Sequence, residues 1–359
     1  MIRNAYKPDS VSHPGTTLEE ALLERGMSQA QLAQRTGRPL KLVNEIIKGK
    51  AAITPETSLQ LEQVLGIPAH FWNARESQYR EFMARRHARI RQHEYISWAE
   101  SFPIREMVQH NWLPGAADKV DLVQTLLSYF GVVSPDQWQS LWVAKQPAFR
   151  KSQTFSSDRS ALIAWLRKGE IDAAAIQCAD FDTQKFTRAL EEVRALTVKP
   201  PEEFEPALID ICSKAGVAVV FVKELPRTRV SGATHWVSPK KALLQMSLRY
   251  RTTDHLWFTF FHEACHILKH GKREFFIEDH SKSNQREEAE ANKFSGDFLV
   301  PPDQFKEFVA QGSFTRKTVK KFADDIGIDP GIVVGQLQHA GEIPRSYLND
   351  LKAGITWAQ

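Results

Sequence analysis

Residues 253–270 read TDHLWFTFFHEACHILKH and predict one long helix that carries a functional motif. Its apolar side chains recur on several sides, which indicates a helix buried in a protein core. His262 and His266 stand four residues apart and therefore lie on one face, where both imidazoles can reach a single ion. Polar groups without partners are costly inside a core, so these histidines need an explanation other than ordinary packing. We expect His262 and His266 to bind zinc.

Glu263 projects about 100° round the helix from His262, too far to share the same ion. From there it can take the proton of an attacking water as a general base and later protonate the leaving amine. His270 lies two turns from His262, roughly 12 Å along the axis, so we do not expect it to join the ion. The alternative is that these are ordinary core or surface side chains.

A catalytic zinc site takes three protein ligands and keeps one open position. A second predicted helix, over 284–299, offers Glu287, Glu288 and Glu290. The apolar face of this helix lies about 40° from Glu287 and roughly 60–70° from Glu288. An acidic first turn favoured by the helix dipole explains all three glutamates equally well. Periodicity therefore leaves the third ligand open.

The domain around these helices opens at Lys199-Pro200-Pro201. A helix over 202–214 and β-branched or apolar strands at 217–222, 229–237 and 242–248 precede the motif helix, and two short helices follow at 315–340. This pattern predicts a C-terminal α+β domain with a small sheet.

Two motifs within residues 199–340 are typical of one family. The first is His262-Glu263-x-x-His266 after Phe258-Thr259, and the second is Glu288-x-Glu290-Ala291-Asn292-x-Phe294 leading to Phe298-Leu299-Val300-Pro301. The segment resembles the ImmA/IrrE family of zinc metallo-endopeptidases. The resemblance implies a zincin-like fold, one Zn²⁺ per chain and Glu288 as the third ligand.

Two positions depart from the family pattern. Ser295-Gly296 replaces the usual Ala-Ala, and both substitutes are small enough to keep close helix packing. Cys265 stands where the family often has Gly. We expect a buried inert thiol there, and the alternatives are an extra soft ligand or an oxidation-sensitive point.

Residues 14–73 show short helices with clear boundaries. Ser28 to Gln31 form a capping box that opens a helix ending at Thr36-Gly37, and a further helix runs from Leu40 to Lys48. One helix capped by Thr17 precedes this pair, and another begins at Thr54-Pro55. Two short helices around a tight turn, packed by their neighbours, predict a helix-turn-helix.

The same segment resembles the HigA-like antitoxins, a branch of the Xre-type helix-turn-helix proteins. The residues that carry the likeness are His13-Pro14-Gly15, Arg25-Gly26-Met27-Ser28-Gln29-x-x-Leu32-Ala33, Ile46-x-x-Gly49-Lys50, Ile53-Thr54-Pro55-x-Thr57, Leu61-Glu62-x-x-Leu65-Gly66 and Phe71-Trp72. The resemblance implies a five-helix fold that binds a double-stranded DNA operator, usually as a homodimer.

Five side chains are candidate DNA contacts. Gln29 stands beside the N-terminus of the second helix, whose amides can bind a phosphate. The third helix would present its polar residues to the major groove, where Asn can pair with adenine and Lys can read guanine or hold phosphate. These residues are Arg38, Lys41, Asn44 and Lys48. The alternative for each is a solvated polar face.

The charge is divided unevenly along the 359 residues. Residues 1–91 hold 14 Lys/Arg and 9 Asp/Glu, a net +5, whereas the remaining 268 hold 33 and 34, a net −1. A basic first quarter is expected if that part binds a polyanion. No apolar run approaches the roughly 20 residues of a membrane span, and no segment is typical of a signal peptide. Three scattered cysteines give no disulfide framework, so we expect a cytoplasmic protein without membrane contact.

The length predicts two or three domains, and the patterns place them at 1–74, 75–198 and 199–359. The middle range is helical and rich in tryptophan, and it begins with a basic helix over 75–92 that either links two domains or contacts phosphate. We therefore expect a mainly α protein with a small α+β domain.

Two functions fit these patterns. The first is a DNA-binding, antitoxin-like transcriptional regulator whose zinc endopeptidase cleaves a protein partner such as a repressor, and a cognate toxin is a further candidate partner. The second is an autoregulating antitoxin or repressor whose zinc domain is a sensor or a structural module. Glu263 favours the enzyme, because a structural zinc site has no need of a base.

Overall fold

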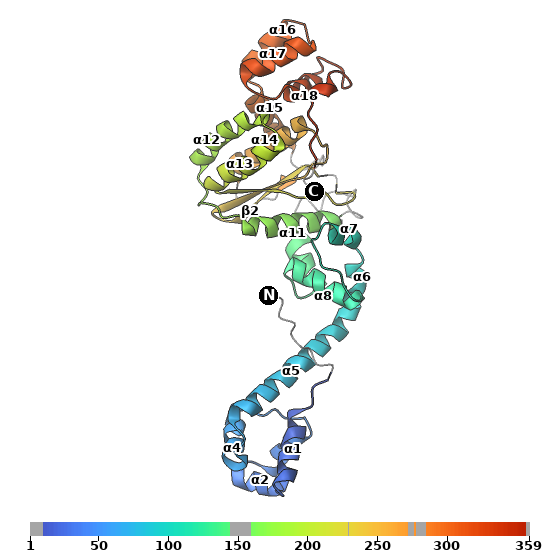
Figure 1. Cartoon of the computed structure of the whole chain (residues 1–359), viewed down its shortest axis with the longest axis vertical. Coiled ribbons are helices and arrows are strands. Elements are labelled where there is room, and N and C mark those ends of the chain that lie inside the picture. Colours follow the sequence, from blue (N-terminus) through green and yellow to red (C-terminus); the bar gives the residue numbers. More distant parts are fainter. Residues whose placement is uncertain (1–9, 144–158, 229, 272–275, 278–284, 357–359) are drawn as a thin grey trace. The chain divides into compact units, whose positions relative to one another are not determined.

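The structure, a computed structural model, describes residues 10–143, 159–228, 230–271, 276–277 and 285–356 (Figure 1). Its contacts divide the chain into two compact units, Met1–Glu94 and Tyr95–Gln359. Helices dominate both units, and one small sheet lies in the second, which confirms the predicted fold class. Within the described ranges, no helix has the length and apolar character that a membrane span requires.

The first unit is built from five helices, as predicted. They are α1 (Pro14–Glu24), α2 (Gln29–Thr36), α3 (Leu40–Ile47), α4 (Pro55–Leu65) and α5 (Ala69–Gln92). The capping box is present, since the Ser28 side chain accepts from the Gln31 amide and the Gln31 side chain accepts from the Ser28 amide. Thr17 was wrongly predicted as the cap of α1. The helix begins at Pro14, because His13 accepts the Gly15 amide and proline is favoured in the first turn.

Helices α1 and α3 approach so closely that only glycine fits at position 15. A Cβ there would stand 2.2 Å from the backbone oxygen of Ile46. The core between the helices is filled by side chains from α1 to α5, including Leu18, Leu32, Ile46, Leu61 and Trp72. This packing fixes α3 against α2, which is the arrangement that a helix-turn-helix requires.

Helix α5 runs through the boundary expected after residue 74. Of its 24 residues only Ala69, Trp72 and Glu76 are buried. Glu76 accepts from the Ile53 amide at 3.2 Å and from Arg80 at 2.7 Å, which anchors the first part of the helix to the unit. The three domain ranges stay a prediction.

The sheet of the second unit has the order β1-β3-β2-β4. Its strands are β1 (Val217–Phe221), β2 (Gly232–Ser238), β3 (Lys241–Met246) and β4 (Phe276–Ile277). β1 and β3 are parallel, whereas β2 is antiparallel to both β3 and β4. The three strands predicted before the motif helix are therefore confirmed, and β4 was not predicted because two residues give no periodicity.

Helices cover both faces of this sheet (Figure 1). On one face lies α11 (Arg159–Ala175), with α8 (Lys119–Phe130) packed against it, and their buried side chains share a core with Val220 and Leu243. On the other lie α13 (Pro201–Lys214) and α14 (Thr253–Lys269), with α12 (Thr183–Ala195) packed against them, and these helices share a core with Val219 and Leu244. Residues before 199 thus complete the core of the sheet.

Short helices α6 (Ile96–Ala99), α7 (Ile104–Gln109) and α9 (Pro135–Trp138) pack around α8. Aromatic side chains fill this region, where Trp98, Phe102, Phe130 and Trp138 contact one another edge to face or at a tilt. Beyond α14 the chain continues through α15 (Gln285–Leu299), α16 (Pro302–Ala310), α17 (Arg316–Ile326) and α18 (Pro330–Ala340).

Candidate functional site

Three side chains from two helices form a cluster of metal-ligand type. His262 and His266 lie on α14 and Glu288 on α15, and their ligand atoms all lie within 4.8 Å of one another. The Nε2 atom of His262 stands 3.2 Å from Glu288 Oε2, and that of His266 stands 3.6 Å from Glu288 Oε1. Two imidazole nitrogens and one carboxylate are a donor set that catalytic zinc sites use. The residues present therefore fit a zinc ion.

The position of Glu288 distinguishes it from its acidic neighbour. Glu290 binds Lys269 at 2.9 Å and His270 at 3.5 Å, on the outer side of the cluster. Glu288 is 21% exposed and faces both imidazoles. Of the two glutamates, Glu288 is thus the one beside the imidazoles, and its role as the third ligand stays a prediction.

The second nitrogen of each imidazole also has a partner. His262 Nδ1 lies 3.0 Å from Asn292 Oδ1, and His266 Nδ1 lies 2.9 Å from His270 Nδ1. Such outer partners fix the orientation of a metal-binding ring and leave its Nε2 for the ion. Sequence reasoning missed both partners. The available signal was spacing, since His270 follows His266 by four residues and Asn292 follows Glu288 by four.

Burial keeps the second histidine neutral. His266 is 1% exposed, and desolvation, aided by His262 and His270, lowers its pKa to about 2. A metal binds only the neutral imidazole, so a low pKa keeps the nitrogen available at neutral pH.

Helix α15 lies directly against α14, which brings Glu288 to the histidines (Figure 1). Ser295 is fully buried and donates its hydroxyl to the backbone oxygen of Phe258 at 2.8 Å. A Cβ on Gly296 would meet Gln336 of α18 at 3.3 Å. The small residues that replace Ala-Ala therefore sit at close helix contacts.

Glu263 is fully buried on α14 and contacts the sheet. Thr234 of β2 donates its hydroxyl to Glu263 Oε2. Cys265, next to the second histidine, is also buried, and burial raises the pKa of its thiol to about 11. A protonated thiol is a poor metal ligand, and Cys265 does not belong to the cluster found among the described residues.

In the first unit, two candidate DNA contacts bind each other. Asn44 of α3 donates to Gln29 Oε1 of α2 at 3.2 Å, and both side chains are half-buried. Lys41 of α3 and Lys48, the residue that follows the helix, are exposed. Lys41 approaches Glu45 only to 3.9 Å, a surface pair of little energetic weight. α3 and its C-cap thus present two lysines and one amide.

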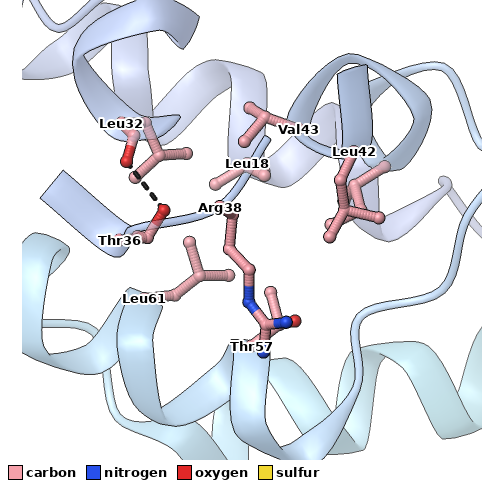
Figure 2. Close-up of a pocket in the computed structure, with 9 residues that line it drawn as sticks. Leu18, Leu32, Thr36, Arg38, Leu42, Val43, Thr57 and Leu61 are labelled. Atoms are coloured by element: carbon pink, nitrogen blue, oxygen red, sulfur yellow. Dashed lines mark hydrogen bonds between the residues drawn. The ribbon is translucent and has the colours of Figure 1, made fainter. Parts of the chain in front are cut away.

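Arg38 occupies a different position from the other candidates. Figure 2 shows its side chain among Leu32, Leu61 and Thr57, where it lines a pocket between α2, α3 and α4. Its Nε donates to Gln60 Oε1 at 2.8 Å. The guanidinium is therefore engaged inside the unit, which sequence reasoning missed because Gln60 is 22 residues away.

Both parts of the chain match known families. The Helix-turn-helix family model matches residues 18–72, and the model of the IrrE N-terminal-like domain of M78 peptidases matches residues 239–327. Among the similar solved structures is an addiction module antidote protein of the HigA family from Coxiella burnetii. It is 35% identical, with 20% of this chain and 80% of that chain covered and a TM-score of 0.20. No curated protein matches. The N-terminal part of the chain therefore carries a helix-turn-helix domain, and its C-terminal part carries a domain similar to the IrrE N-terminal-like domain of M78 peptidases.

Proposed function

We propose that this protein is a DNA-binding, antitoxin-like regulator whose second unit is a zinc-dependent endopeptidase. The observation that carries the proposal is the formed donor set of His262, His266 and Glu288 beside the buried carboxylate of Glu263. The substrate would be a protein partner such as a repressor or a cognate toxin, in the cytoplasm where operator DNA is found.

Each residue of the site has a distinct task in this proposal. His262, His266 and Glu288 would hold one Zn²⁺, which when bound supplies Lewis-acid activation of water and of the peptide carbonyl. Glu263 takes the proton of the attacking water and delivers it to the leaving amine. Asn292 and His270 keep the two imidazoles oriented through their Nδ1 atoms.

The first unit would bring the enzyme to an operator. Its α3 would enter the major groove, with Lys41, Asn44 and Lys48 toward the DNA and Gln29 near a phosphate. Domains of this kind bind two half-sites as dimers, so the proposal includes a homodimer. Arg38 can contact DNA only if its guanidinium leaves Gln60. We propose instead that it supports the packing of the helices in the first unit.

A second candidate function rests on the burial of the site. Glu263 is fully buried, and His262 and His266 are each 1% exposed. A buried base would not reach a protein substrate. This burial favours an autoregulating antitoxin or repressor in which zinc acts as a sensor or a structural element.

A matched comparison separates the two functions. The zinc content of the purified chain would be measured, and the wild type and Glu263→Gln would each be incubated with proteins encoded by neighbouring genes. If the protein is an endopeptidase, both the wild type and Glu263→Gln should hold about one zinc per chain, and only the wild type should cleave a protein. A reporter on the protein's own promoter that responds to helix-turn-helix variants, together with no cleavage by either chain, would instead favour the repressor.

A further inference from the structure

Strand β2 contacts Glu263 at two positions that lie on one face of the strand. Gly232 and Thr234 are two residues apart and so point the same way. Thr234 donates its hydroxyl to Glu263 Oε2. A Cβ placed on Gly232 would stand 2.7 Å from both Cγ and Oε1 of Glu263. Both positions therefore face the Glu263 carboxyl group. Thr234 donates a hydrogen bond to it, and Gly232 leaves room for it.

The hydrogen bond from Thr234 fixes an otherwise loose group. The last torsion of a glutamate side chain is broad, because rotation about an sp³–sp² bond has no sharp minima. Thr234 is 1% exposed and Glu263 is fully buried, so solvent does not compete strongly for this contact. A bond from a hydroxyl to an ionised acceptor is stronger than one between neutral groups. Donation to Oε2 thus selects one orientation of the carboxylate plane.

Gly232 is needed for space and not for its backbone conformation. Its φ is not among the positive values found in the described residues, so its backbone is open to any residue. Its Cβ position, however, lies 2.7 Å from Glu263 and also 2.7 Å from Cγ2 of Thr259. Real Cβ atoms do not approach other atoms so closely, and a side chain at 232 would move β2 or the carboxylate.

We propose that Thr234 is a positioning residue for Glu263, with Gly232 providing the space in which the carboxylate is held. The role rests on the proposed function, in which Glu263 is the general base. A base must stand within hydrogen-bond reach of the proton that it takes, and a misplacement of about 1 Å can cost about 100-fold in rate. Thr234 acts through Glu263 and does not belong to the cluster of His262, His266 and Glu288.

The first test measures the contact without any substrate. The zinc-loaded full chain is unfolded with urea, and the release of zinc is measured as the signal of unfolding. The wild type, Thr234→Val, Glu263→Met and the double variant are compared. Each single change removes one side of the contact between Thr234 and Glu263, whereas the double change replaces both sides with apolar groups of similar shape. The singles should lower the midpoint, and the double variant should lose less than the sum of the two. Additive losses would overturn the proposal whether or not the protein is an enzyme.

The second test asks whether the contact serves catalysis. With the neighbouring-gene protein that the wild type cleaves, Thr234→Val should lower kcat about 10- to 100-fold with little change in KM. Thr234→Ser, which keeps the hydroxyl, should restore most of kcat. Thr197→Val is the matched control, because Thr197 is equally buried and its hydroxyl has no partner among the described residues. Unchanged kcat in Thr234→Val overturns the proposal. If the wild type cleaves nothing, the proposed function fails, and the urea cycle alone decides whether Thr234 holds the carboxylate.

Discussion

The Nε2 atoms of His262 and His266 lie 3.1 Å apart, and both face the carboxylate of Glu288. Two imidazole nitrogens and one carboxylate that converge in this way are a donor set of metal-ligand type. An ion among them would satisfy all three at once. The arrangement supports the proposed metal centre between the two helices.

The choice of the third ligand gives the first prediction. Glu288→Ala should weaken zinc binding by more than the roughly 100-fold that is the upper range for outer partners. Glu287→Ala and Glu290→Ala are matched controls on the same helix, and each should change the affinity less. Competition with a chromogenic chelator measures all three. A larger effect from Glu287→Ala would show that the ligand is misassigned.

The outer partners of the histidines give the second prediction. His270→Ala and Asn292→Ala should each weaken zinc binding about 10- to 100-fold, because an imidazole free to rotate offers its nitrogen less often. His255→Ala, an exposed histidine on the same helix, should leave the affinity unchanged. Equal affinities for His270→Ala and His255→Ala would argue that the contact with His266 has no role in metal binding.

The third prediction concerns pH in the metal-free protein. In the folded state the pKa of His266 is lowered to about 2, mainly by burial, whereas in an unfolded chain it is about 6.5. Between these values the unfolded chain binds a proton at this imidazole and the folded chain does not. The free energy of unfolding is therefore unaffected by His266 above pH 6.5, and below it falls with the pH by up to about 1.4 kcal/mol per pH unit. Urea midpoints at several pH values measure it, and His266→Gln should show a shallower fall. Parallel curves would contradict the prediction.

DNA binding by the first unit gives the fourth prediction. Asn44→Ala should cost about 1–3 kcal/mol on a specific operator, because a bidentate pair with adenine is lost. Lys41→Ala should weaken binding on all sequences and reduce the slope of log K against log salt by about 0.9 if the lysine neutralises a phosphate. Titrations at several salt concentrations measure both effects. Glu263→Gln should bind DNA like the wild type, and an unchanged operator affinity in Asn44→Ala would exclude its role in base readout.

Local patterns predicted much of this architecture. Apolar periodicity predicted the motif helix and its neighbour, the β-branched run predicted β1, and the Ser28 capping box gave the start of α2. The metal site needed more than periodicity, because the orientation of α15 depends on how it packs on α14. The resemblance to a family supplied Glu288 where the angles on a helical wheel favoured no residue.

Three of the contacts that were missed join distant parts of the chain. Thr234 is 29 residues from Glu263, Asn292 is 30 from His262, and Gln60 is 22 from Arg38. Helical and strand periods place a side chain on a face, but they do not say which element packs against that face. The cap of α1 is a different case. Pro14 at the first helical position is a local signal for a helix that begins there, with His13 as its cap.

The most direct test of the central claim compares protein termini in cells. Wild-type protein, Glu263→Gln and His262→Ala would be expressed in the source organism at equal levels, and new N-termini would be identified by mass spectrometry. Zinc content of the purified chains is the control for the site, with about one ion expected in the wild type and Glu263→Gln and a loss in His262→Ala. The account predicts at least one new N-terminus that the wild type produces and neither variant does. Identical sets of termini in all three strains, with zinc present in the wild type, would contradict the peptidase.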